Sequence, residues 1–199
     1  NKPMYILGTG LSHDSSTCLM KDGQIVVGIE KERLTRKKHD GFNDNLTIEY
    51  CLNAENITFD DVDLIVQEDT CNPEYKPEEI QKRAGRIIPD NIPKITISHH
   101  LAHAYSALGT SPFTNMSIIV IDGQGSSLDN CIDVDGNNFS SSLSNLKNKN
   151  KYWEFMSCYS FNGSELKTLS KDFGLFHLWD REKFPAAPED MLNSIGEFY

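Results

Sequence analysis

An Asp-Gly pair between two strand-like segments near the start of the chain most constrains the fold. Asp22 and Gly23 separate the apolar residues 17–20 from a second apolar stretch, residues 24–30. A two-residue hairpin turn needs positive φ, and Asp-Gly is a pair that adopts it readily. A third short apolar segment, residues 5–8, comes before them. The pattern therefore predicts three antiparallel strands at the start of the chain.

The rest of the chain alternates helical and strand periodicity. Residues 45–54 show helical spacing, with Leu46, Tyr50 and Ala54 on one side. Four consecutive β-branched apolar residues at 118–121 are typical of a strand covered on both faces. Further helices are expected at residues 77–86 and 99–108, and further strands at 62–67, 94–98, 152–160 and 165–170, the last two flanking Asn162-Gly163. This order predicts an α/β fold with a mixed sheet and helices packed on the sheet.

Composition excludes several classes of function. The chain of 199 residues has a formal net charge of −10, whereas a grip on nucleic-acid phosphates needs clusters of Lys and Arg. The 5 cysteines are scattered and odd in number, which favours reduced thiols over a disulfide framework or a thiolate zinc site. No apolar run approaches the ~20 residues of a membrane span. We therefore expect a cytoplasmic protein with neither nucleic acid nor a membrane as partner.

Two regions, one polar and one at residues 188–199, depart from this pattern. Residues 123–151 are rich in Ser, Asn and Asp, which predicts a hairpin and a long loop that is mobile over residues 137–149. Residues 188–199 begin like a helix, with Pro188 in the first turn, and the apolar residues of that helix have nothing after them to pack on. We expect residues 1–199 to be one N-terminal portion of a domain that continues beyond them.

A histidine pair offers the sharpest chemical signal. His99 and His103 are four residues apart on a predicted helix, so both rings lie on one face. Asp122 follows the buried strand at 118–121, and Gly123 and Gly125 after it would let a ligand approach the backbone closely. Two imidazoles and one carboxylate suit Fe²⁺, Zn²⁺ or Mn²⁺ with open positions left for substrate. The alternative is a solvated histidine pair beside an ordinary aspartate at a strand end.

Four blocks occur in an order that resembles a known family, at residues 6–15, 30–40, 99–107 and 121–123, and residues 194–199 fit the same pattern. Together they resemble the nodulation-type carbamoyltransferases, which include antibiotic O-carbamoyltransferases. The N-terminal domain of that family is similar to the metal protein of tRNA threonylcarbamoyl transfer. The resemblance therefore implies an actin-like ATPase fold, that is, a ribonuclease-H-like lobe.

The resemblance implies a reaction in two steps. A C-terminal domain, which we expect beyond this chain, makes carbamoyl adenylate from ATP and carbamoyl phosphate. The N-terminal domain then passes the carbamoyl group to a hydroxyl of a sugar-like acceptor. The family's metal ligands fall on His99, His103 and Asp122, with Fe²⁺ favoured, and a further aspartate ligand is expected after Tyr199. We therefore expect the 199-residue chain alone to be inactive in transfer.

Other positions gain a role from the same resemblance. The family's early histidine falls on His13, which could take the proton of the attacking hydroxyl; the alternative is a turn residue bonded to Asp14. Lys38 and His39 match a block that we assign to cofactor binding together with the two glycines at 123 and 125. The alternative for that basic block is a solvated turn. One departure is Ser126, close to where the family commonly carries an acidic residue.

Two rival functions remain open at this stage. A kinase or ATPase of the same fold would hold phosphates at the turn of residues 8–16 and use no transition metal. A non-enzymatic module would bind a tRNA-modifying partner or a small ligand. His99 and His103 argue against the first rival, and loss of the later metal ligand would favour the second.

Overall fold

The chain forms two compact units in a computed structural model that describes residues 2–12, 14–68, 85–123, 125–134 and 152–175. The first unit comprises residues 1–106 and the second residues 107–199. The single lobe expected from the sequence stays a prediction, since each unit is described by itself. The expectations for residues 77–84, 137–149 and 188–199 lie outside the described residues.

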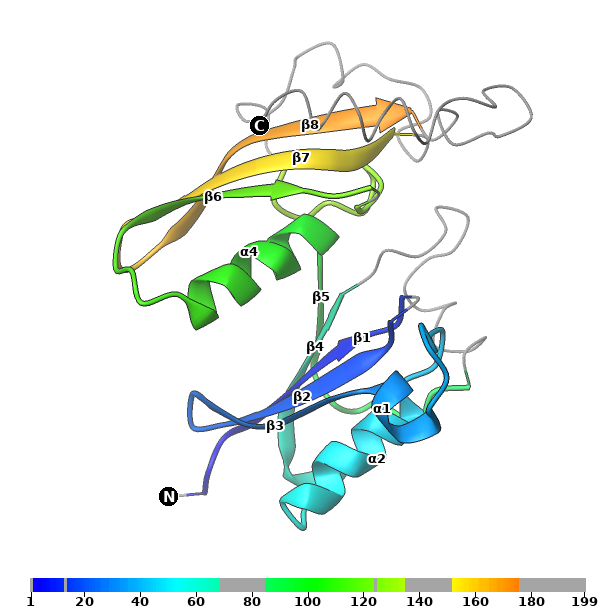
Figure 1. The fold of residues 1–199 in the computed structure, drawn as a ribbon. Coiled ribbons are helices and arrows are strands. Elements are labelled where there is room, and N and C mark those ends of the chain that lie inside the picture. Colours follow the sequence, from blue (N-terminus) through cyan, green and yellow to red (C-terminus); the bar gives the residue numbers. More distant parts are fainter. Residues whose placement is uncertain (1, 13, 69–84, 124, 135–151, 176–199) are drawn as a thin grey trace, which may run out of the picture. The chain divides into compact units, whose positions relative to one another are not determined.

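A five-stranded mixed sheet organises the first unit (Figure 1), in the order β3-β2-β1-β4-β5. The strands are β1 (Tyr5–Gly10), β2 (Ser16–Lys21), β3 (Gln24–Glu30), β4 (Val62–Glu68) and β5 (Lys94–Ile97). β1, β2 and β3 pair antiparallel, whereas β4 pairs parallel with both β1 and β5. The predicted α/β class, the mixed sheet and the three antiparallel N-terminal strands are confirmed.

The turn between β2 and β3 forms as the Asp-Gly pair predicts. Asp22 has φ 49° and Gly23 has φ 81°, the two positive values that this hairpin turn requires. The Asp22 carboxylate also accepts a hydrogen bond of 2.9 Å from the backbone N–H of Met4. The Asp22 side chain therefore connects the hairpin turn to the residue that precedes β1.

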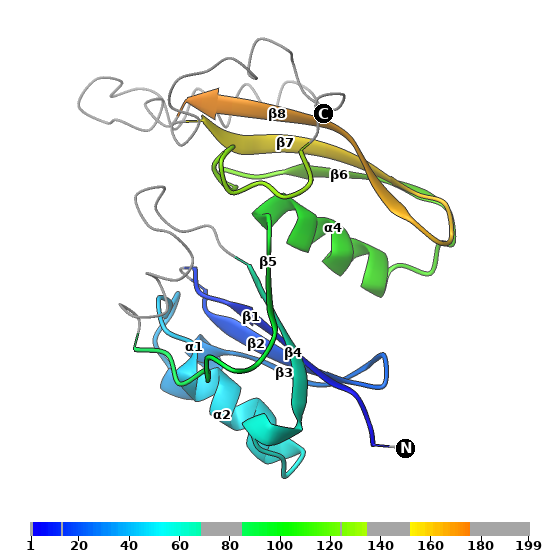
Figure 2. The same cartoon turned by 180° about the vertical axis from the view of Figure 1, so that it is seen from behind.

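Helices account for a smaller part of the described chain. They are α1 (Lys31–Thr35), α2 (Asn45–Ala54), the single 3₁₀ turn η1 (Phe59–Asp61) and α4 (His99–Thr110), which begins in the first unit and ends in the second. Both views show α2 along one face of the sheet (Figures 1 and 2), where it contacts β2 and β3. Within the described residues no helix combines the length and the apolar character that crossing a membrane requires.

The buried face of α2 differs from the expected one. Thr47, Ile48, Cys51 and Leu52 are buried, whereas Leu46 and Tyr50 are 46% and 44% exposed. The predicted face is therefore wrong. The reason is a polar contact: the Thr47 hydroxyl lies 2.7 Å from the Thr17 hydroxyl of β2, so a threonine can face the core at little cost.

A buried arginine joins three elements of the first unit. The guanidinium of Arg86 donates to both carboxylate oxygens of Asp44, at 2.9 and 2.5 Å. It also donates to Gln67 Oε1 on β4 at 3.0 Å and to Thr9 Oγ1 on β1 at 2.9 Å. The side chains of Arg86 and Asp44 are only 1% and 0% exposed. Asp44 precedes α2, so this one ion pair fixes the helix start against two strand ends.

The second unit contains a three-stranded antiparallel sheet, in the order β6-β7-β8. Its strands are β6 (Met116–Ile121), β7 (Tyr152–Phe161) and β8 (Leu166–Leu175). Gly163 has φ 89° in the turn between β7 and β8, so the predicted hairpin is confirmed. The expectation that residues 118–121 are covered on both faces is wrong, because Ile119 and Ile121 are 64% and 41% exposed. β6 is an edge strand that buries only the face carrying Ile118 and Val120.

A buried ionic network crosses the sheet of the second unit. The Lys171 ammonium on β8 pairs with Glu154 on β7 and lies 2.9 Å from Asp133. It also donates to the Tyr159 hydroxyl at 3.0 Å, which in turn donates to Asp133 at 3.2 Å. Burial by itself would lower the pKa of Lys171, but Glu154 and Asp133 outweigh it and raise that pKa. Lys171 is therefore a charged residue held in the sheet interior.

We expect Arg86→Met to destabilise the first unit by about 3–5 kcal/mol, because it leaves the Asp44 carboxylate buried without its cation. Urea unfolding followed by circular dichroism measures the loss. Lys37→Met, at a side chain 76% exposed, is the control and should cost less than about 1 kcal/mol. The double variant Arg86→Met with Asp44→Asn should recover part of the loss. Equal unfolding midpoints for Arg86→Met and the control would contradict this role.

In the second unit, Lys171→Met should cost about 3–5 kcal/mol, since Glu154 would remain buried with an uncompensated charge. Lys167→Met is the matched control on the same strand, because its side chain is 58% exposed and pairs with an exposed Glu165. Near-UV circular dichroism during urea unfolding reports the aromatic packing around Tyr159. The interpretation fails if both lysine variants unfold at the same urea concentration.

Candidate metal centre

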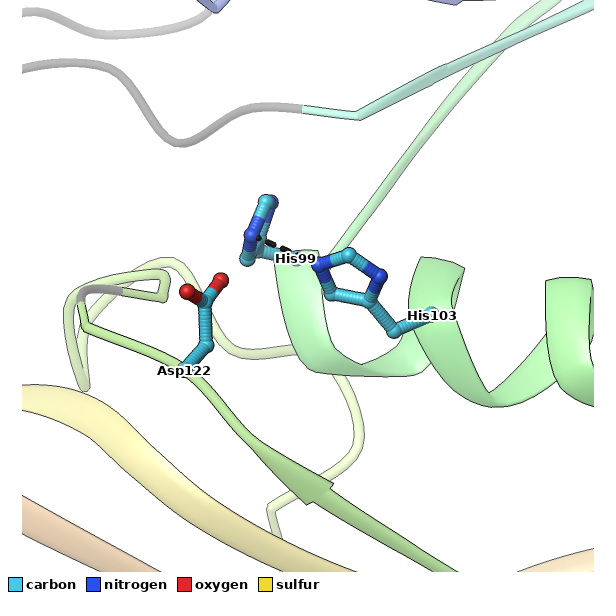
Figure 3. Close-up of side chains that lie close together, drawn as sticks. All are labelled: His99, His103 and Asp122. Carbon is cyan, nitrogen blue, oxygen red and sulfur yellow. Dashed lines mark hydrogen bonds between the residues drawn. The ribbon is translucent and has the colours of Figure 1, made fainter. Parts of the chain in front are cut away.

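Two histidine rings meet at the start of α4. β5 ends at Ile97, Ser98 follows, and α4 begins at His99. The Ser98 carbonyl accepts the N–H of Ala102 at 3.0 Å, which sets the first turn of the helix. One turn apart, His99 Nε2 and His103 Nε2 lie 3.0 Å from each other (Figure 3). The ring planes are nearly perpendicular, at 87°. The sequence prediction that both rings share one face is confirmed.

A glutamate at the end of β4 contacts the Nδ1 atom of His99, the ring nitrogen that faces away from His103. Glu68 Oε1 lies 2.7 Å from His99 Nδ1, and the two side chains are 14% and 15% exposed. The sequence analysis did not single out Glu68. The available signal was its position, since it is a carboxylate at the carboxyl end of a buried parallel strand, the edge where α/β sheets gather ligand-binding groups.

The histidine pair borders a cavity of about 670 Å³ within the first unit. Its wall combines the carboxyl ends of β1 and β4, the start of β2, the end of β3 and the first turns of α4. The polar and ionisable residues that line it, besides the two histidines, include Ser12, Asp14, Glu30, Arg33, Glu68 and Tyr105. The cavity is thus a site where imidazoles, carboxylates and one guanidinium face a common space.

The predicted cofactor-binding pair, Lys38 and His39, lies in the loop after α1. His39 has φ 56°, and this left-handed backbone lets its N–H donate to Glu32 Oε2 at 3.2 Å. The His39 ring lies 2.7 Å from the Asp14 carboxylate, while Lys38 Nζ lies 3.1 Å from Glu32. The hydrogen bond from the His39 N–H, followed by the Lys38 ammonium, lowers the pKa of Glu32. Through Asp14, His39 is connected to the wall of the cavity.

The remaining sequence-predicted residues belong to other segments of the chain. Asp122, labelled in Figure 3, follows β6 in the second unit, and its carboxylate accepts the N–H of Gly123 at 2.6 Å. Gly125 is buried and donates its N–H to the Glu154 carbonyl at 2.8 Å. The approach of Asp122 to the histidine pair and the binding roles of the two glycines stay predictions. His13 lies outside the described residues.

Comparison with curated proteins gives relatives of low but significant similarity. The nodulation protein NolNO of Sinorhizobium fredii is 30% identical over 136 residues, covering 57% of this chain and 20% of the relative. Uncharacterized proteins of Synechocystis sp. and Methanocaldococcus jannaschii are 29% and 27% identical, with 26% and 25% of their lengths covered. The chain therefore spans about a fifth to a quarter of the relatives that it matches.

Comparison with solved structures and with family models gives two further similarities. YeaZ from Pseudomonas aeruginosa aligns over 87% of this chain and 68% of that protein, with a TM-score of 0.44 and 10% identity. Residues 5–86 match the family described as the carbamoyltransferase N-terminus. That stretch runs from the first residue of β1 to the buried Arg86, and thus contains the sheet edge that carries Glu68. The resemblance to carbamoyltransferases seen in the sequence is therefore confirmed over residues 5–86.

Proposed function

We propose that this chain is the N-terminal part of an ATP-dependent O-carbamoyltransferase, which transfers a carbamoyl group to a hydroxyl of a sugar-like acceptor. The match of residues 5–86 to a carbamoyltransferase N-terminus supports the proposal that the transferred group is a carbamoyl group. The observation that carries the site is the 3.0 Å approach of His99 Nε2 and His103 Nε2 at the edge of a cavity. Carbamoyl adenylate is the proposed donor, made from ATP and carbamoyl phosphate elsewhere in the whole enzyme.

The histidine pair fits a divalent metal ion. Metal–nitrogen bonds of about 2.0–2.1 Å place two neighbouring imidazole nitrogens roughly 2.9–3.4 Å apart, for octahedral to tetrahedral angles. The 3.0 Å between the two Nε2 atoms falls within that range. We propose Fe²⁺ as the ion, with Zn²⁺ or Mn²⁺ as alternatives, and Asp122 as a third ligand. Such an ion supplies Lewis acidity that polarises a bound oxygen.

The residues of the chain have separate tasks in the proposed transfer. The acceptor oxygen attacks the carbamoyl carbon, the bond from that carbon to the adenylate phosphate oxygen breaks, and AMP leaves. We assign the acceptor proton to His13, whose chain neighbours Ser12 and Asp14 line the cavity. An imidazole suits proton transfer near neutral pH. Arg33 also lines the cavity, and its guanidinium can bind the phosphate oxygens of the leaving group.

Metal binding by this chain is the first test. A titration with Co²⁺, followed by its visible absorption, should show one site per chain in the wild type. His103→Ala should weaken that site by about 100-fold or more, because loss of a ligand exceeds the 10–100-fold typical of losing a hydrogen-bond partner of a ligand. His39→Ala removes another imidazole of the same unit and should change the affinity by less than about threefold. Equal weakening by the two variants would contradict the assignment.

The transfer reaction is the second test and uses the whole enzyme. His103→Ala should abolish carbamoylation of the acceptor while adenylate formation from ATP and carbamoyl phosphate continues, since the two steps use different domains on this proposal. Misplacement by about 1 Å of a group that positions the reacting atoms can cost about 100-fold in rate. Parallel assays of both steps measure the difference. Loss of both activities, or undiminished transfer, would overturn this division.

A further inference from the structure

Glu68 is the last residue of an interior strand in the sheet of the first unit. Its strand, β4, is hydrogen-bonded on both sides, to β1 and to β5. Glu68 itself lies opposite Gly10 on one neighbour and Ile97 on the other. The preceding residue, Gln67, accepts a hydrogen bond from the buried Arg86. The backbone at Glu68 is therefore held between two neighbouring strands, and the residue lines the cavity.

The side chain of Glu68 directs the His99 ring. A neutral imidazole carries its proton on one nitrogen only, and a carboxylate accepts hydrogen bonds but donates none. The 2.7 Å contact from Glu68 Oε1 therefore places the His99 proton on Nδ1. The lone pair is then on Nε2, which is the nitrogen 3.0 Å from His103 Nε2. The carboxylate thus orients the ring and selects the tautomer at once.

Gly10 of β1 lies near the second carboxylate oxygen of Glu68, Oε2. A methyl group at Gly10 would lie 3.7 Å from Glu68 Oε2, an ordinary van der Waals contact. The glycine therefore leaves a small space beside the carboxylate, and β1 supplies no side chain at Gly10 that competes for it.

We propose that Glu68 is a positioning residue of the metal centre, which holds His99 in the Nδ1–H tautomer with Nε2 directed at the ion. The inference rests on the proposed function, because it names the group that prepares the proposed ligand pair. A carboxylate on the outer nitrogen of a ligating histidine orients the ring and raises its basicity, and its loss costs about 10–100-fold in metal affinity. Glu68 therefore acts through His99 without contacting the ion or the substrate.

Co²⁺ titration of the 199-residue chain tests this role with three variants. Glu68→Gln keeps the size and an acceptor oxygen but removes the charge, and should weaken Co²⁺ binding about 10-fold. Glu68→Leu removes the acceptor and should weaken it about 100-fold. Glu30→Gln is the matched control, since Glu30 lines the same cavity and pairs with Arg33; we expect a change below about threefold. Equal effects of Glu68→Gln and Glu30→Gln, or no effect of either Glu68 variant, would overturn the proposal.

A metal-free measurement separates this inference from the metal centre itself. Long-range ¹H–¹⁵N spectra of the metal-free wild type should show the neutral His99 ring protonated on Nδ1, and Glu68→Leu should shift it toward the Nε2–H form. If Co²⁺ does not bind but the Nδ1–H tautomer depends on Glu68, the proposed metal centre fails and the orienting contact stands. If the wild-type ring carries its proton on Nε2, the positioning role is refuted whatever the metal does.

Discussion

The buried ion pair of Arg86 and Asp44 is the contact on which the geometry of the first unit depends. One guanidinium reaches the residue before α2, Thr9 at the end of β1 and Gln67 at the end of β4. Two of these residues precede a residue that lines the cavity: Gly10 follows Thr9, and Glu68 follows Gln67. An ion pair without solvent is costly unless nearly every donor and acceptor is satisfied. The four hydrogen bonds from Arg86 to Asp44, Gln67 and Thr9 meet that demand.

The position of the histidine pair depends on this edge of the sheet, where β1 and β4 end. β5 pairs with β4 up to the level of Glu68, and α4 begins two residues after β5 ends. A short connection from a parallel strand to a helix allows little freedom at the first helical turn. His99 therefore starts the helix within reach of the Glu68 carboxylate, and His103 follows one turn later. The register of β4 and β5, the Glu68 carboxylate and the start of α4 together determine where the two histidine rings lie.

The charges around the cavity suit a cation better than a free anion. Asp14, Glu30 and Glu68 face it, against one guanidinium from Arg33. Arg33 itself lies within ion-pair distance of Glu30 and Glu32. A phosphate-bearing donor would meet repulsion from these carboxylates, which a bound divalent ion would offset. This balance links the proposed metal to the proposed carbamoyl adenylate.

Local chemistry in the sequence determined the strands, the hairpin turns and the histidine spacing. Asp22-Gly23 and Asn162-Gly163 mark turns because glycine adopts positive φ readily, and His99 and His103 share a face because a helix turns every ~3.6 residues. Only the tertiary structure decided which face of α2 is buried, since Thr47 enters the core through a hydroxyl of β2 that lies thirty residues away. It also decided the roles of Glu68 and Arg86, because a carboxylate or guanidinium in the sequence carries no sign of its distant partner. Periodicity and turn chemistry act between neighbours in the chain, whereas buried polar contacts depend on residues that only the folded sheet brings together.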